Sequence, residues 1–530
     1  MGSRSRVLLV GIAVLAAFQV PGSSLAAEQD RAEPRLLSRF QGDTGEITGA
    51  PARALRSGPL SVDPAAVAAA KAEAPAVDRS PVPLSVSPTP TILESAEGIH
   101  QEDVTPSDST GAIGTTRYIE VVNSMVGIYD RNLNLIADDT LNTWWDTNGN
   151  SFDPQVIWDP TTKRFYYAGD VVFVNANLLA FGFSTTASPG NLTSDWCNYF
   201  VNYGKRFPDY PKLGDSKFFA IIGVNVFRGN NFLGSDVVAI SKPPAGTSCP
   251  DPTSFDLGIG EDLAVGGTVH STPVPANEID TNRIGWVLTV PDSTSASSLG
   301  RFKVTRDTTT GDPVIQTSGT SIPVSSFSVP PNAPQKDGSF NLDTLDGRLT
   351  QAVAAKDPDH GKGLQIWTQH TISGGAGAAV RWYEIVAPSG TVTQSGTVSD
   401  GSLYLFNGAV SPDRVVKGKT KAFGQNMVLG FNTSSSDTYP AIQMVGKRGA
   451  DDVSARVLVK SSPGHDEDFA CQHDGFCRWG DYAAATPDPG ASTGAATGVV
   501  WLTNMWTQDA DTTGGSDGTS WRTWNWSAMP

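Results

Sequence analysis

Four charged residues stand at the start of short apolar segments that lie far apart in the chain. They are Asp153 in DPQVIWD, Asp209 in DYPKLGD, Arg348 in RLTQAVA and Asp481 in DYAAAT. Carboxylates that are crowded together repel, so the pKa of one rises and a protonated acid stands beside an ionised base. Cleavage of a glycosidic bond needs such a pair. We therefore regard these four as candidate catalytic residues, provided that the fold brings them together. We then expect Arg348 to contact at least one of the aspartates, since a cation there offsets carboxylate repulsion.

Three other polar residues occupy comparable positions and are candidate substrate-binding residues: Tyr210, His270 and Asn407. Tyr210 or His270 could also serve as a general base. Two alternatives stay open for the aspartates. Their oxygen atoms suit calcium, a hard cation, and buried aspartates can also simply accept hydrogen bonds from the backbone of a neighbouring segment.

A second calcium hypothesis concerns Asp146, Asn148 and Asn150, which have the early spacing of a calcium-binding loop. The segment lacks the later glycine and the closing glutamate of that loop. A simple hairpin turn is the alternative. Calcium is the one cofactor that the sequence suggests.

The four cysteines permit three disulfide pairings. We favour Cys471–Cys477, which closes a small loop, and Cys197–Cys249, which ties two neighbouring segments. The alternative at the first pair is a zinc site that adds His473. An oxidising compartment favours the disulfides.

The segments that carry these residues belong to a weak internal repeat. From about residue 105, short aromatic and β-branched runs alternate with Gly, Asn, Asp and Pro, which is typical of all-β proteins. Seven similar units begin near residues 111, 153, 209, 271, 348, 406 and 480. A propeller blade needs about 40 to 50 residues. The repeat therefore predicts an all-β fold, a seven-bladed β-propeller over residues 105–530, whose innermost strands begin around one channel mouth.

Several of these units resemble a family of secreted bacterial β-propeller proteins without an established function. The resemblance rests on FPDYPKLGD, LDTLDGRLTQAVA and CRWGDYAAATPDP, and it extends over most of residues 108–527. It implies a propeller fold and export, and it carries no catalytic assignment. A more distant similarity to sialidase-type propellers is limited to GSDGTSW, at residues 515–521.

The N-terminal part of the chain has a different composition. Arg4 and Arg6 precede the apolar run VLLVGIAVLAAFQV and the small residues SSLAAEQ, which predicts a signal peptide over residues 1–27. The run is too short to span a bilayer as a helix. Residues 28–104 are rich in Ala and Pro and predict a disordered linker or pro-region, with one short helix near DPAAVAAAKAE.

The formal charge of −16 argues against two classes of partner. Nucleic acid and anionic membranes need basic patches, and the sequence has none. No G-x-S-x-G, H-E-x-x-H or P-loop motif occurs. We expect a secreted, extracellular monomer, without a membrane span, that acts on a polysaccharide through the acidic mouth, as a glycoside hydrolase or polysaccharide lyase. The alternative is a non-enzymatic propeller for recognition or adhesion at a cell-surface ligand.

Overall fold

The computed structural model describes residues 36–37, 63–73, 87–361, 363–508 and 521–530. The signal peptide predicted over residues 1–27 and most of GSDGTSW lie outside the described residues. Sheets of at least four strands, paired almost entirely antiparallel, make up seven blades, which confirms the predicted seven-bladed β-propeller. The innermost strands of consecutive blades contact one another around the ring.

The first three blades follow one another along the chain, each from its innermost to its outermost strand. Blade 1 consists of β3 (Thr110–Ile113), β4 (Tyr118–Val122), β5 (Met125–Tyr129) and β6 (Leu135–Thr140). Blade 2 consists of β7 (Asn150–Asp159), β8 (Arg164–Val172), β9 (Asn177–Ser184) and β10 (Trp196–Gly204), with β1 (Leu36–Leu37) at its edge. Blade 3 consists of β11 (Phe207–Asp215), β12 (Phe219–Arg228), β13 (Asn231–Ser241) and β14 (Leu257–Gly260).

The next three blades carry additional short strands. Blade 4 consists of β15 (Ala264–Val265), β16 (Thr268–Pro275), β18 (Gly285–Pro291), β19 (Ser295–Arg306), β20 (Pro313–Ile315) and β21 (Thr320–Ser328). Blade 5 consists of β17 (Asn277–Glu278), β22 (Leu349–Lys356), β23 (Leu364–Gly374), β24 (Gly377–Val386) and β25 (Val392–Val398). Blade 6 consists of β26 (Tyr404–Pro412), β29 (Met427–Ser435), β30 (Thr438–Lys447) and β31 (Val457–Ser461), and the hairpin of β27 (Val415–Lys417) and β28 (Thr420–Ala422) follows β26.

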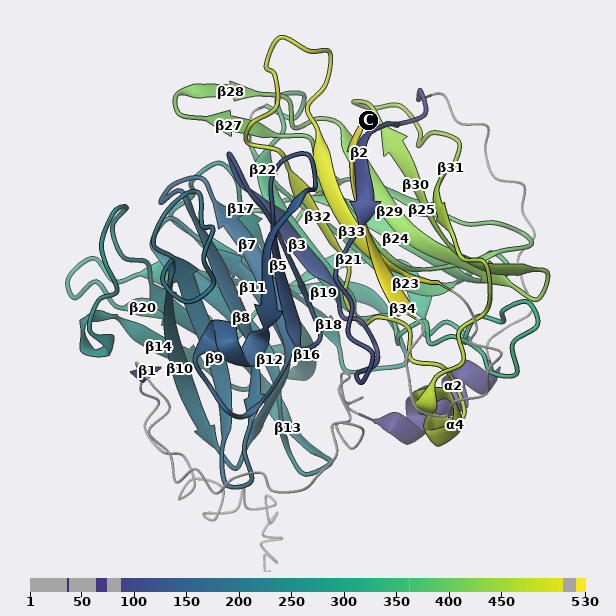
Figure 1. Cartoon of the computed structure of the whole chain (residues 1–530), viewed down its shortest axis with the longest axis horizontal. Helices are drawn as coiled ribbons and strands as arrows, with labels where there is room; N and C mark the ends of the chain where they lie inside the picture. Colours follow the sequence, from purple (N-terminus) through teal and green to yellow (C-terminus); the bar gives the residue numbers. More distant parts are fainter. Residues whose placement is uncertain (1–35, 38–62, 74–86, 362, 509–520) are drawn as a thin grey trace, which may run out of the picture.

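Blade 7 joins the two ends of the propeller. Its strands are β32 (Ala484–Pro487), β33 (Val500–Thr507), β34 (Trp521–Met529) and, outermost, β2 (Thr91–Glu97). Figure 1 shows the purple β2 beside the yellow β34, and the two strands pair from Thr91–Met529 to Glu97–Trp524. The predicted domain start at residue 105 is therefore too late, because β2 lies in the segment that was interpreted as a linker. Backbone pairing between β2 and the last strand, β34, therefore joins the two ends of the propeller.

Aromatic side chains fill the blades. The largest fully buried side chains include Trp144, Trp145, Trp367, Trp479, Trp521 and Trp526. Each belongs to a cluster of buried apolar residues within or between blades. Burying such rings stabilises the sheets, and it leaves these tryptophans unable to stack on a sugar in this structure.

The described helices are short. They are α2 (Pro64–Glu73), α3 (Leu141–Trp145), α4 (Phe469–Asp474) and the 3-10 helix η2 (Pro252–Ser254). α2 confirms the helix expected near DPAAVAAAKAE, and Asp63 begins it by accepting a hydrogen bond from the Ala66 backbone. None of the helices in the described ranges is long and apolar enough to cross a membrane.

Candidate functional site

The candidate residues lie where the innermost strands are irregular. In β7, β11, β16 and β26 the pairing register shifts near the start of the strand. Asp153, Tyr210, Thr272 and Asn407 have positive φ angles of 53°, 59°, 51° and 48° at these bulges. Proline or glycine follows each of them. These residues suit a bulge because the hydrogen bonds between the strands are interrupted there, and no backbone N–H is needed for the pairing. A bulge with a residue of positive φ therefore recurs in four blades.

The predicted aspartates come together from different blades. The charges of Asp209 and Asp481 both act on Asp153. Tyr482, the neighbour of Asp481, donates its hydroxyl to Asp153 Oδ2 at 2.9 Å. The Asp481 amide donates to Oδ1 of Asp108, at the start of blade 1, at 2.8 Å. Residues far apart in the sequence are thus neighbours where the inner strands meet.

Lys212, which was not among the candidates, lies at the centre of this group. Its Nζ lies 3.7 Å from the ring centroid of Tyr210 and 3.5 Å from that of Tyr482. Lys212 is 1% exposed, and within the described residues its Nζ has no hydrogen-bond partner. Burial lowers the pKa of Lys212 well below its usual value, although the charges of Asp153 and Asp108 oppose the shift. The signal in FPDYPKLGD was a lysine within the inner strand, three residues after Asp209.

We call this group the axial cluster. It consists of Asp108, Asp153, Asp170, Asp209, Tyr210, Lys212, Arg348, Arg478, Asp481 and Tyr482.

Arg348 and Arg478 have different hydrogen-bond partners. The sequence predicted that Arg348 pairs with one of the candidate aspartates. Arg348 instead donates to both oxygens of Asp346, at 2.7 and 2.6 Å, and its guanidinium lies 5.1 Å from the Tyr210 ring centroid. Arg478 donates to Asp481 at 2.5 Å. The loop before β22 therefore supplies the carboxylate that Arg348 hydrogen-bonds, while the charges of Asp209 and Asp481 also interact with Arg348.

Burial shifts the carboxyl groups of the axial cluster towards protonation. It raises the pKa of Asp108, Asp153 and Asp481 to about 7 in each case. The charge of Asp153 adds to the shift of Asp108, and the charge of Asp209 adds to that of Asp153. Burial also raises the pKa of Asp170 well above its usual value, and neither of its oxygens has a hydrogen-bond partner among the described residues. Near neutral pH, protonated and ionised carboxyl groups therefore lie side by side.

The axial cluster is closed to solvent in this structure. Asp153, Asp209 and Asp481 are at most 2% exposed. Asp343, in the loop before Arg348, is close enough to act on Asp481, and it accepts a hydrogen bond from Lys71 of α2 at 2.6 Å. The N-terminal helix thus rests on the loop that borders the cluster.

Two of the predicted substrate-binding residues have structural contacts instead. His270 is 2% exposed, its Nδ1 lies 2.7 Å from Thr289 Oγ1, and burial lowers its pKa to about 4. Asn407 donates to Asn432 at 3.2 Å and to Asn504 at 3.0 Å, which connects blades 6 and 7. These side chains hold strands together, and only Tyr210 of the three belongs to the axial cluster.

The segment from Asp146 to Asn150 forms a turn. Asp146 ends α3 with a φ of 54°, and the Thr147 amide donates to the carbonyl oxygen of Asn142 at 3.0 Å. The turn connects α3 to β7, so it is not the hairpin turn of the alternative, and calcium binding remains a prediction.

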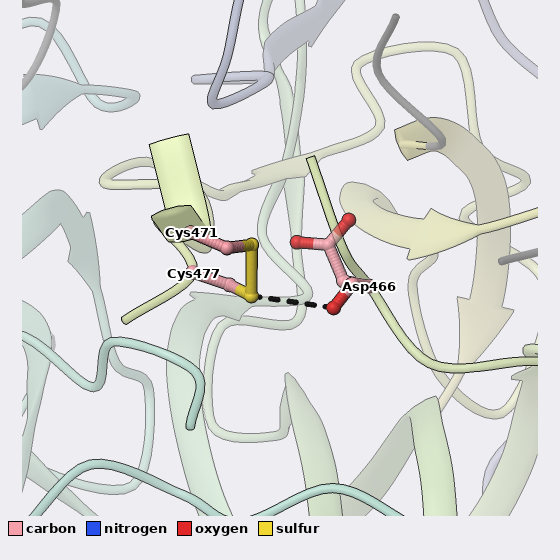
Figure 2. A group of neighbouring side chains, drawn as sticks. All are labelled: Asp466, Cys471 and Cys477. Carbon is pink, nitrogen blue, oxygen red and sulfur yellow. Dashed lines mark hydrogen bonds between the residues drawn. A yellow bond between two sulfur atoms is a disulfide. The ribbon is translucent and has the colours of Figure 1, made fainter. Parts of the chain in front are cut away.

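Both predicted disulfides are present, Cys197–Cys249 and Cys471–Cys477. Figure 2 shows Cys471 bonded to Cys477 with Asp466 beside them, and the carbonyl oxygen of Asp466 approaches Cys477 Sγ to 3.2 Å. An oxidised cysteine has no S–H to donate, so this approach is a packing contact. The disulfide also removes both thiolates that a zinc site would need. Two disulfides fit an oxidising, extracellular environment.

Comparisons with known proteins give only distant similarities. No family model matches the sequence, and no curated protein matches it. A subtype N10 neuraminidase-like protein of A/little yellow-shouldered bat/Guatemala/060/2010 is 8% identical, with a TM-score of 0.35 over 69% of this chain and 99% of the other. The hemagglutinin-neuraminidase of parainfluenza virus 5 is 11% identical, with a TM-score of 0.35 over 71% and 93%. An exo-β-1,3-galactanase from Phanerochaete chrysosporium is 12% identical, with a TM-score of 0.28 over 70% and 94%.

Similarities this low carry no argument about activity. Of the resemblance inferred from the sequence, the propeller fold is what the structure shows. The chain is a seven-bladed β-propeller with a buried charged cluster where its inner strands meet.

Proposed function

We propose that this protein is an exported propeller that acts on an extracellular glycan through the axial cluster, by acid–base hydrolysis. The observation that carries the proposal is the meeting of Asp153 and Asp481 from different blades, each with a pKa raised to about 7. Carboxyl groups that titrate near neutral pH can donate and accept a proton in one reaction.

The hydrogen bonds assign different roles to the two carboxyl groups. Asp153 Oδ2 accepts from Tyr482, whereas Oδ1 has no hydrogen-bond partner among the described residues. A proton on Oδ1 is therefore available to a leaving oxygen, and Asp153 is the proposed general acid. Asp481 accepts from Arg478, which favours its ionised form, and it is the proposed general base.

The reaction requires the axial cluster to open. The loop that contains Asp343 and Asp346 borders the cluster, and Lys71 holds α2 against that loop. α2 has no buried side chain, so its packing opposes displacement weakly. We propose that a ligand reaches the cluster when this loop and α2 move aside.

The test is the release of new reducing ends from a panel of neutral polysaccharides by the purified protein. Asp153→Asn and Asp481→Asn should each abolish release, because neither amide can exchange the required proton. Asp437→Asn is the matched control, since Asp437 is exposed in the turn between β29 and β30. Absence of release from every polymer, or equal activity of D153N and the native protein, would contradict the proposal.

A cleft on blade 2 favours a second candidate function, glycan binding without catalysis. The cleft has a volume of about 640 Å³ and lies at the outermost strand of its blade, away from the axial cluster. Trp196 and Tyr199 form part of its wall, and Asn198 and Asp251 supply polar groups. Binding of a polysaccharide that Asn198→Ala weakens, without release of reducing ends, would support this function.

A further inference from the structure

A second group of titratable side chains lies at the end of β22, after the last residue of that strand. Asp357 follows β22, His360 lies in the next turn and Glu384 lies on β24. The Nδ1 atom of His360 lies 2.6 Å from Asp357 Oδ2 and 3.5 Å from Glu384 Oε1. One nitrogen or oxygen atom from each residue falls within 4.8 Å of the others. Arg348 precedes β22, so this group is at the opposite end of the strand from the axial cluster.

The other oxygen atoms of the two carboxylates accept hydrogen bonds, and these bonds orient Asp357 and Glu384. Asp357 Oδ1 accepts from the Asp359 amide at 2.7 Å, and Glu384 Oε2 accepts from Gln394 Nε2 at 2.9 Å. Glu384 is fully buried, and its Oε1 has no hydrogen-bond partner among the described residues. A buried carboxylate oxygen without a donor is costly, and this one points at the same place as His360 and Asp357.

The corresponding ends of other inner strands show that this arrangement is unusual. Asp413, at the end of β26, accepts hydrogen bonds from the Gly424 and Gly498 amides and from the Asn426 side chain. Those donors occupy both of its oxygens. At the end of β22, a backbone amide reaches only one oxygen of Asp357, and the other oxygen lies beside a histidine and near a second acid.

We propose that Asp357, His360 and Glu384 bind a divalent first-row transition metal ion, with Zn²⁺ as the probe. One imidazole nitrogen and two carboxylate oxygens suit Zn²⁺ or Mn²⁺, whereas calcium prefers oxygen ligands alone. The side chain of His360 is 33% exposed, so the metal would keep an open position towards solvent. Gln394 and the Asp359 amide orient the two carboxylates, as outer partners of metal ligands do.

Other charged groups surround these three side chains and affect them when no metal is bound. The Lys447 ammonium acts on both Glu384 and Asp357, and it donates to the carbonyl oxygen of Gly449. Asp359 and Asp451 also act on Lys447. Without a metal, burial and the neighbouring Asp357 raise the pKa of Glu384 to about 8, so that a proton offsets the carboxylate repulsion.

The test uses the full chain, stripped with a chelator and dialysed against Zn²⁺, with bound metal measured by mass spectrometry and affinity by calorimetry. We expect one Zn²⁺ per chain, a higher melting temperature with Zn²⁺, and a loss of affinity of at least about 10-fold in His360→Gln and in Glu384→Gln. Gln394→Ala should weaken binding on the order of 10-fold, because it removes an outer partner.

The control is His473→Gln, since His473 is also exposed and also lies beside an acid, Asp474, at 2.7 Å. This variant should bind Zn²⁺ as the native chain does. Because His360 is partly exposed, H360Q should fold, and its circular dichroism spectrum checks that it does. No Zn²⁺ binding by the native chain, or binding that H360Q and E384Q leave unchanged, would overturn the proposal.

Discussion

Buried aspartates lie at both ends of the inner strands, but their surroundings differ. At the far end, Asp159 and Asp215 share the ammonium of Lys242, at 2.8 and 2.6 Å, and all three side chains are at most 2% exposed. In the axial cluster, Lys212 is equally buried, yet its ammonium faces two tyrosine rings and has no hydrogen bond to a carboxylate among the described residues.

This difference separates structural charges from candidate functional ones. Although burial raises the pKa of Asp159, the Lys242 ammonium and hydrogen bonds bring it below its usual value, whereas burial outweighs the same ammonium at Asp215 and raises its pKa to about 6. In the axial cluster, burial prevails and holds the pKa of Asp153 at about 7. A buried charge with matched partners stabilises a fold, whereas one without them is a candidate for chemistry.

The largest effect is expected from Lys242→Met. Removal of its ammonium leaves Asp159 and Asp215 as buried carboxylates without a cation, which should lower the free energy of unfolding by about 3–5 kcal/mol. Urea denaturation measures the change. Arg456→Met is the control, because Arg456 and its partner Asp400 are 28% and 20% exposed, and such a pair contributes less than about 1 kcal/mol.

The next effect concerns pH. A carboxyl whose pKa is about 7 in the folded state and about 4 in the unfolded state binds more protons when folded between these values. Stability should therefore fall as pH rises from about 4 to about 7, with a slope of about 1.4 kcal/mol per pH unit for one group. Asp153→Asn should flatten this slope, and urea denaturation at several pH values measures it. An identical slope in the variant would mean that Asp153 does not titrate there.

A smaller change in stability is expected from Lys212→Met. The methionine keeps most of the side-chain volume and removes a buried ammonium that has no hydrogen bond among the described residues, so the cost should be below about 1 kcal/mol. Any release of reducing ends should nevertheless be lost, since a basic group that interacts with Asp153, Asp108 and Asp481 is gone. If K212M destabilised the protein as much as K242M, the contrast between the two ends would fail.

The smallest effect on global stability is expected from Lys71→Met. Lys71 and Asp343 are 16% and 20% exposed, so loss of their ion pair should change unfolding by less than about 1 kcal/mol. Cleavage of α2 by a protease should become faster, because no side chain of this helix is buried. Limited proteolysis of this variant and of the exposed control Lys419→Met measures the rate of cleavage in α2. Equal cleavage rates in the two variants would show that Lys71 does not hold α2 in place.

Local sequence signals were sufficient for most of the fold. Alternating aromatic and turn residues predicted the seven blades, and the recurring Asp153, Asp209 and Asp481 positions identified inner strands whose residues lie together. The early β2 strand escaped prediction because its pairing with β34 joins the two ends of the chain, and no local pattern encodes such a partner.

The partners within the site were less predictable. Arg348 appeared suited to a candidate aspartate, but the nearby Asp346 binds it, and Arg478 binds Asp481 instead. His270 and Asn407 share the repeat position of the other candidates, yet their side chains bond within and between blades. Each side chain's direction depends on the bulge around it, which residue type alone does not reveal.

By itself, the sequence determined the strand content and the number of blades, because β-propensity and turn residues act over short distances along the chain. The tertiary structure decided which charges are neutralised and which stay without a partner, because burial and the distances between blades set each pKa. Lys212 lies in the inner strand β11, and Lys242 directly follows β13. Only the surroundings of the two lysines distinguish them.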